Sequence, residues 1–148
     1  MSVPVSKRAK GKLEVFTLIN NLVQYTEQKV QNKNYFSFAL NQVVDEKIVP
    51  NNLKPVLAKN IYSETLAIKN YANRANKVYV KTSADYTLRR EFQNKAITEI
   101  SALRKDIERA MIVCNIPGKE IYYWEGLLHT IEELLRNWRN EEYIKYMG

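Results

Sequence analysis

The clearest hydrophobic pattern lies between Gly118 and Tyr146. Six large apolar residues recur there at alternating steps of three and four, which places them along one face of a helix; they are Ile121, Trp124, Leu128, Ile131, Leu135 and Trp138. Leu127 and Leu134 widen this face beyond what a single neighbouring helix covers. The pattern therefore predicts a helix over about 118–146 that packs against at least two others.

The same spacing predicts three earlier helices, over about 12–31, 52–77 and 84–115. The apolar face of the first contains Phe16, Ile19, Leu22, Val23, Thr26 and Val30. That of the second contains Leu57, Ile61, Thr65, Ile68, Ala72 and Ala75. That of the third contains Leu88, Phe92, Ala96, Ile100, Leu103, Ile107, Ala110 and Cys114. Ser83 is expected to cap the third helix, with Asp85 near its positive end. The break at Pro117-Gly118 predicts that the third and fourth helices pair as an antiparallel hairpin.

The remaining segments complete a one-domain prediction. Residues 1–11 carry Lys7, Arg8 and Lys10 without apolar periodicity, which is typical of a basic flexible arm. Residues 35–50 fit a strand or a short helical turn equally well, so periodicity leaves both open. A chain of 148 residues with only four Gly and four Pro favours one helical domain over a turn-rich sandwich or barrel. The predicted fold is all-α, an antiparallel up-down four-helix bundle over residues 12–148.

Charge adds a candidate function. The chain has a net charge of +7, and residues 1–81 contain 13 Lys and Arg against 5 Asp and Glu, whereas the rest contains 10 against 11. A basic half indicates a polyanion such as RNA or DNA, or an acidic protein, although such a charge can also simply keep a protein soluble. The predicted second helix is the most basic long element. The candidate nucleic-acid contacts are Lys54, Lys59, Lys69, Arg74 and Lys77 on that helix, with Arg89 and Arg90 on the next.

Two features qualify these candidates. Arg89 lies near the apolar face of its helix, so it is either a surface arginine with a buried stem or an interface or RNA contact. Ten Tyr residues are many for a four-helix core, and their hydroxyls need water or a partner. Subunit contacts or stacking on bases are the two uses we expect at the surface for Tyr62, Tyr71, Tyr79, Tyr122, Tyr123, Tyr143 and Tyr146.

The sequence favours neither catalysis nor metal binding. One Cys and one His cannot form a Cys/His zinc site, and no Gly-rich phosphate loop or nucleophile–base motif is present. We expect Cys114 to be a core thiol and His129 a surface residue, with Glu132-Glu133 and Glu141-Glu142 on solvated faces. The expectation is therefore a non-enzymatic protein without cofactors. No apolar run reaches the roughly 18 residues of a membrane span, and the N-terminus lacks a signal-peptide core, so we expect a cytoplasmic protein.

Three stretches carry a family resemblance that covers about residues 53–143. They are Ile61–Asn76 with its closing Ala-Asn, Arg89–Ala96, and the segment from Trp124 through Leu134-Leu135-Arg136-Asn137-Trp138-Arg139. The chain resembles the accessory variability determinant (Avd) proteins of diversity-generating retroelements, within the four-helix-bundle family that includes proteins encoded in ribosomal-RNA intervening sequences. The connection over 35–50 is longer than the usual link in that family.

The resemblance implies a ring-shaped homo-oligomer, pentameric in this family. It also implies a basic surface that engages a partner reverse transcriptase and its template RNA and assists mutagenic cDNA synthesis without performing chemistry. The alternative is a structural or protein-interaction bundle with no nucleic-acid role. In that alternative the basic half meets an acidic protein, and the Tyr-rich surfaces build an oligomer.

Overall fold

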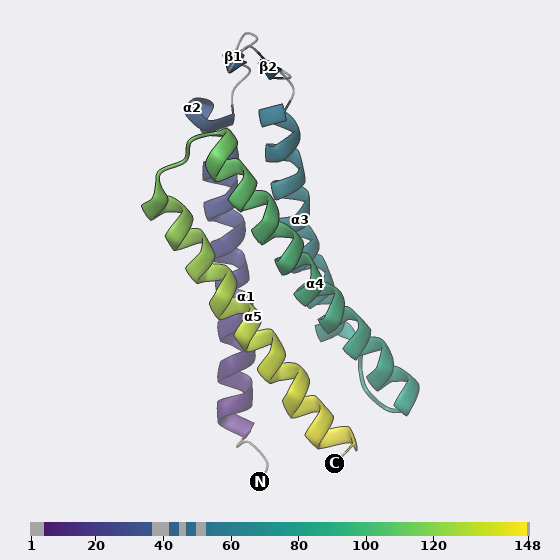
Figure 1. Ribbon diagram of the computed structural model, residues 1–148. Coiled ribbons are helices and arrows are strands. Elements are labelled where there is room, and N and C mark those ends of the chain that lie inside the picture. The colour runs from purple at the N-terminus through teal and green to yellow at the C-terminus, as the bar shows by residue number, and fades with distance from the viewer. Residues whose placement is uncertain (1–4, 37–41, 45–46, 50–52, 148) are drawn as a thin grey trace.

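The protein is a helical bundle in a computed structural model that describes residues 5–36, 42–44, 47–49 and 53–147. Its four long helices are α1 (Val5–Val30), α3 (Leu53–Lys77), α4 (Ser83–Val113) and α5 (Gly118–Met147). The short helix α2 (Lys33–Phe36) and the strands β1 (Gln42–Val44) and β2 (Lys47–Val49) lie between α1 and α3. Figure 1 shows the long helices side by side, with the two strands beyond one end and the last turn of α5 at the other.

Each long helix packs against two others. α1 contacts α3 and α5, α4 contacts the same two helices, and the most extensive contact is between α3 and α4. Helix α4 follows α3 after a five-residue link, and α5 follows α4 after residues 114–117. The four apolar faces consequently enclose a single core, and the predicted helical bundle is confirmed.

The apolar face predicted for α5 forms the centre of that core. All six residues, from Ile121 to Trp138, are buried, and Leu127 and Leu134 pack against them half-buried. The six positions predicted for α3 are buried too. In α4 the prediction fails at Leu88, whose side chain is 43% exposed, while Tyr86 and Gln93 are buried instead. At the start of α4 the buried face therefore includes Tyr86 in place of Leu88. The ring of Tyr86 packs on that of Tyr146 of α5, with ring centroids 5.4 Å apart.

A chain of hydrogen bonds crosses the core and joins three helices. The indole Nε1 of Trp124 donates to Oγ1 of Thr26 at 3.1 Å, and the hydroxyls of Thr26 and Thr65 lie 3.3 Å apart. Oγ1 of Thr65 donates to the carbonyl oxygen of Ile61 at 2.8 Å. Because a hydroxyl has one hydrogen and can also accept, these polar groups satisfy one another within the core. α5, α1 and α3 are thereby connected through buried polar atoms.

For its described part, the structure answers whether the connection between α1 and α3 is a strand or a helical turn. The described part forms α2 and an antiparallel hairpin in which Gln42 lies opposite Val49 and Val44 opposite Lys47; residues 37–41, 45–46 and 50–52 lie outside the described chain. Glu120 of α5 anchors α2, because its carboxylate accepts hydrogen bonds from Lys29 and Tyr35, which lower the pKa of Glu120. Apart from this short hairpin, the described chain is helical, as the all-α prediction requires.

Two predicted helix starts differ from the structure. α1 begins at Val5, inside the segment expected to be a flexible arm. Its extra turns lack apolar periodicity, but an existing helix extends at little cost through residues such as Ala9 and Lys10. The cap of α4 is Thr82 instead of Ser83: its hydroxyl accepts from the N–H of Asp85, and the Asp85 carboxylate accepts from the N–H of Thr82.

Candidate nucleic-acid interface

Three of the five basic residues predicted on α3 share its outer side. Lys59, Arg74 and Lys77 are all exposed. At 100° per residue they fall within a sector of about 60° on the side opposite the buried Ile61, and they span about 27 Å along the helix axis. We call these three residues the α3 stripe. It forms a line of positive charge on one surface of the bundle.

The positive charge of the α3 stripe is not offset by ion pairs within the described chain. Within the described part of the chain, none of its three residues forms a salt bridge. Glu64, the single acidic residue of α3, has its pKa raised to about 8, first by burial and then by the neighbouring carboxyl groups of Asp106 and Glu99. Near neutral pH Glu64 is therefore mostly protonated and does little to offset the stripe.

The other two predicted α3 contacts lie apart from the stripe. Lys54 and Lys69 are half-buried. Lys54 sits at the start of α3 close enough to the buried Cys114 to influence the pKa of that thiol, which burial raises. By helical angle Lys69 is about 80° from the Ile61 direction, closer to the buried face than to the stripe. The structure therefore brings together only part of the predicted set.

Arg89 is held inside the protein. Its Nη1 donates to Oε1 of Glu142 at 2.6 Å and its Nη2 donates to the carbonyl oxygen of Val78. The side chains of Arg89 and Glu142 are 12% and 9% exposed. The expectation of a solvated Glu142 is thus wrong, because the guanidinium of Arg89 compensates the burial of this carboxylate. With its charge paired, Arg89 is poorly placed for a phosphate, and we leave it out of the interface.

Arg90, by contrast, belongs to a second basic area between α4 and α5. Its Nη1 donates to the hydroxyl of Tyr86 at 3.2 Å, and its Cζ lies 5.6 Å from the ring centroid of Tyr143. Nη1 of Arg139 donates to Oδ1 of Asn94 at 2.8 Å. Burial and then the charges of Arg90 and Arg136 lower the pKa of Arg139. We call Tyr86, Arg90, Arg139, Tyr143 and Tyr146 the Arg–Tyr patch.

Sequence reasoning found Arg90 but did not include its partners among the site residues. Arg139 and Tyr143 are far from Arg90 in the sequence and come from a different helix. The signal was present in the closely spaced Arg136 and Arg139 and in the Tyr-rich end of the chain. Recognising the patch required the alignment of α4 against α5, which periodicity within one helix does not provide.

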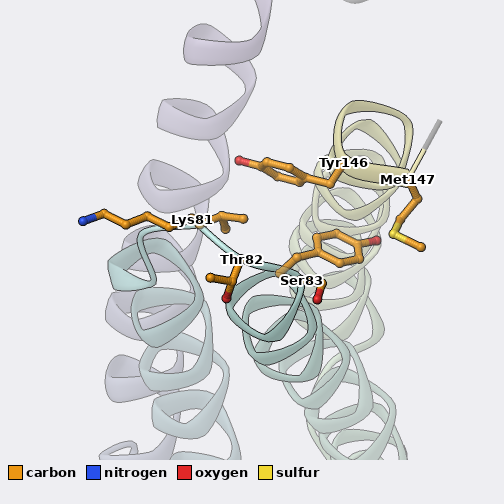
Figure 2. Close-up of a pocket in the computed structure, with 7 residues that line it drawn as sticks. Lys81, Thr82, Ser83, Tyr146 and Met147 are labelled. Carbon is orange, nitrogen blue, oxygen red and sulfur yellow. The ribbon is translucent and has the colours of Figure 1, made fainter.

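A cavity of about 240 Å³ adjoins the Arg–Tyr patch. It is lined by Val80, Lys81, Thr82, Ser83, Tyr86, Tyr146 and Met147. Figure 2 shows Tyr146 and Met147, at the end of α5, facing Thr82 and Ser83, while the ammonium group of Lys81 points away. Because Tyr86 and Tyr146 belong to both the patch and the cavity lining, the two features are continuous.

The structure also places the remaining candidate groups of the described chain. Over residues 5–36, 42–44, 47–49 and 53–147, no group of three His, Cys, Asp or Glu side chains is arranged to hold a metal ion. Cys114 is buried and His129 is exposed, as predicted. None of the described helices has the length and apolar character needed to cross a bilayer.

The comparisons with known proteins leave the family unassigned. Comparison of the chain with protein-family models, curated proteins and solved structures gave no significant match. The likeness to Avd proteins consequently stays a prediction based on three stretches of sequence.

Proposed function

We propose that this protein is a non-enzymatic accessory subunit that binds a reverse transcriptase and its template RNA and assists mutagenic cDNA synthesis in a diversity-generating retroelement. The resemblance to Avd proteins supplies the biological setting. The observation that carries the proposal is the α3 stripe, three exposed cations that form no salt bridge within the described chain. Such charges favour a phosphate backbone because each contact releases condensed counterions.

The proposal includes the assembly and the compartment. We propose an antiparallel up-down four-helix bundle that forms a ring-shaped homo-oligomer, pentameric by the resemblance, and acts in the cytoplasm. Large apolar side chains near the turn between α4 and α5 support an assembly, since Ile112 is 83% exposed and Tyr122 is 82% exposed. Exposed apolar and aromatic side chains of this kind are enriched in protein interfaces.

The same exposed residues favour one alternative function, a structural or protein-interaction bundle without a nucleic-acid role. In that case the apolar residues would form subunit contacts, and the α3 stripe would meet an acidic protein. The two functions differ in what the α3 stripe binds.

The test is a charge reversal of the stripe. The variant Lys59→Glu/Arg74→Glu/Lys77→Glu is compared with Lys105→Glu/Arg109→Glu/Lys119→Glu, which changes the net charge equally at three exposed residues elsewhere. Binding of the template RNA is followed by fluorescence anisotropy over a salt series, and binding of the reverse transcriptase by co-purification. We expect the stripe variant to lose about tenfold or more in RNA affinity and to have a shallower salt dependence. Equal RNA affinities for the two variants would favour the structural alternative.

A further inference from the structure

We infer that the Arg–Tyr patch is a second binding surface, separate from the α3 stripe, and that it binds single-stranded nucleic acid with one base in the adjoining cavity. This inference rests on the proposed function for the class of ligand. Beyond the proposed function, it states that the bound nucleic acid is single-stranded and names the residues of α4 and α5 that bind it.

The first support is uncompensated charge. Arg90 and Arg139 are each held by a neutral partner, the hydroxyl of Tyr86 and the amide oxygen of Asn94. Neutral partners fix a guanidinium in place without cancelling its charge. In the described structure neither arginine has a carboxylate within 4 Å. Two oriented guanidinium groups side by side suit the oxygens of a phosphodiester backbone.

Three acidic residues of α4 and α5 are engaged elsewhere. Glu142 binds Arg89, and Glu132 binds both Arg104 and Arg136. Asp85 accepts the backbone N–H groups of Lys81 and Thr82. Glu91, next to Arg90, and Glu141, two residues after Arg139, form no salt bridge with either arginine in the described structure, so both guanidinium groups can meet an anion from outside the protein.

The second support is the position of the aromatic rings. The side chain of Tyr143 is 52% exposed, and the guanidinium of Arg90 lies over its ring. An exposed ring beside a cation provides a platform on which a base can stack, and every base offers the necessary face. In a duplex these faces are covered by neighbouring base pairs, so the platform favours an unpaired strand.

The lining of the cavity favours binding of a base over binding of a phosphate. Asp85 lies at the start of α4, where its carboxylate accepts the N–H groups of Lys81 and Thr82, and its negative charge disfavours a phosphate there. What faces the cavity is aromatic and hydroxyl surface, from Tyr86, Tyr146, Thr82 and Ser83. A volume of about 240 Å³ is below that of pockets for drug-sized ligands, which start near 300 Å³, and is suited to a single base.

The size of the surface limits the strand to a few nucleotides. Arg139, Tyr143 and Tyr146 follow one another along α5, and seven residues of helix extend about 11 Å. We therefore expect a short, sequence-tolerant contact whose phosphates lie on the arginines and whose bases lie on the tyrosines.

The test compares strand states on patch variants of the full chain. A labelled single-stranded RNA of about 12 nucleotides and its duplex are titrated by fluorescence anisotropy over a salt series. The variants are Arg90→Gln/Arg139→Gln and Tyr143→Leu, and the matched control is Lys105→Gln/Arg109→Gln, which removes two exposed charges outside the patch. Circular dichroism melts establish that each variant is folded. If the arginine variant does not fold, Tyr143→Leu carries the test, since its ring is about half exposed.

We expect the wild type to bind the single strand about tenfold more tightly than the duplex. The arginine variant should lose about tenfold for the single strand, and its slope of log K against log salt should fall by about 1.4, from two lost contacts at about 0.7 each. Tyr143→Leu should weaken the single strand by about tenfold and the duplex hardly at all. Equal affinity for the two strand states, or patch variants that bind like the control, would overturn the inference.

The outcomes separate this inference from the proposed function. Loss of RNA binding only in the α3 stripe variant would overturn the inference and leave the proposed function standing. Loss only in the patch variants would remove the α3 stripe from the proposed function and support the inference. A wild type that binds neither RNA at low salt would overturn both.

Discussion

Arg89 and Glu142 form a buried ion pair between residues 53 positions apart in the sequence. We expect Arg89→Met to lower the free energy of unfolding by about 3–5 kcal/mol, because it leaves the Glu142 carboxylate buried without a partner. The double variant Arg89→Met/Glu142→Leu should recover most of this loss, since apolar residues of similar volume need no compensation. Urea unfolding of the wild type, both single variants and the double variant measures the difference. If the losses of the two single variants add up to the loss of the double variant, this account of the ion pair is contradicted.

Glu64 predicts a pH dependence of stability. Its pKa of about 8 in the folded chain lies above its ordinary value of 4.5, mainly because of burial. Between these values the folded chain binds more protons than the unfolded chain, so this residue makes stability fall as the pH rises from about 5 to about 8. We expect Glu64→Gln to reduce the fall in melting temperature across this range, and to be more stable than the wild type near pH 8.

The matched control for Glu64 is Glu91→Gln, which alters an exposed carboxylate that forms no salt bridge within the described chain. It should show the same fall in melting temperature as the wild type. Melting temperatures of Glu64→Gln that track those of the wild type at every pH would show that Glu64 is ionised normally in the folded protein.

At the level of elements, the start of α4 depends on a single cap. Thr82 and Asp85 exchange hydrogen bonds between side chain and backbone, which satisfies N–H groups that the helix cannot. We expect Thr82→Ala to lower the free energy of unfolding by about 1 kcal/mol. Thr87→Ala, one turn further along, is the control: Thr87 is exposed and bonds only to the Ser83 carbonyl. Equal losses in the free energy of unfolding for Thr82→Ala and Thr87→Ala, measured by urea titration, would show that Thr82 does not stabilise α4 as a cap.

Periodicity predicts the long helices well because each buries one apolar face. The alternating three and four steps from Ile121 to Trp138 identify α5, and the six positions of α3 are buried as the pattern requires. Residues 35–50 could not be assigned, because a short run of aromatic and β-branched residues fits a strand or a turn. The start of α1 was missed because helix extension there leaves no apolar signature. Thr82 and Ser83 are both good capping residues, and only backbone geometry distinguishes them.

The candidate site could be predicted only where it lies on one helix. The α3 stripe follows from the basic residues of α3 and their helical spacing. The Arg–Tyr patch depends on α4 lying beside α5 so that Arg90 reaches Tyr143. Likewise, nothing local distinguishes Glu142 from the exposed Glu133, since the burial of Glu142 depends on Arg89 in another helix.

For the whole molecule, the two basic surfaces lie on different parts of the bundle. The α3 stripe is on the outer side of α3, and the Arg–Tyr patch lies between α4 and α5, with α4 packed against both α3 and α5. If both surfaces bind RNA as proposed, one strand reaches from the first to the second only by passing around α4 or α1.

The hydroxyl chain through Trp124, Thr26 and Thr65 has a consequence for how the helices are aligned. The apolar face of a helix repeats about every turn, so hydrophobic packing alone allows one helix to slide along its axis by about 5.4 Å relative to its neighbours. Such a slide would leave the indole N–H or a threonine oxygen without a hydrogen-bond partner among apolar side chains, at a cost of about 1–3 kcal/mol for each group. These three polar residues therefore select one axial register for α1, α3 and α5 from the several that hydrophobic packing alone permits.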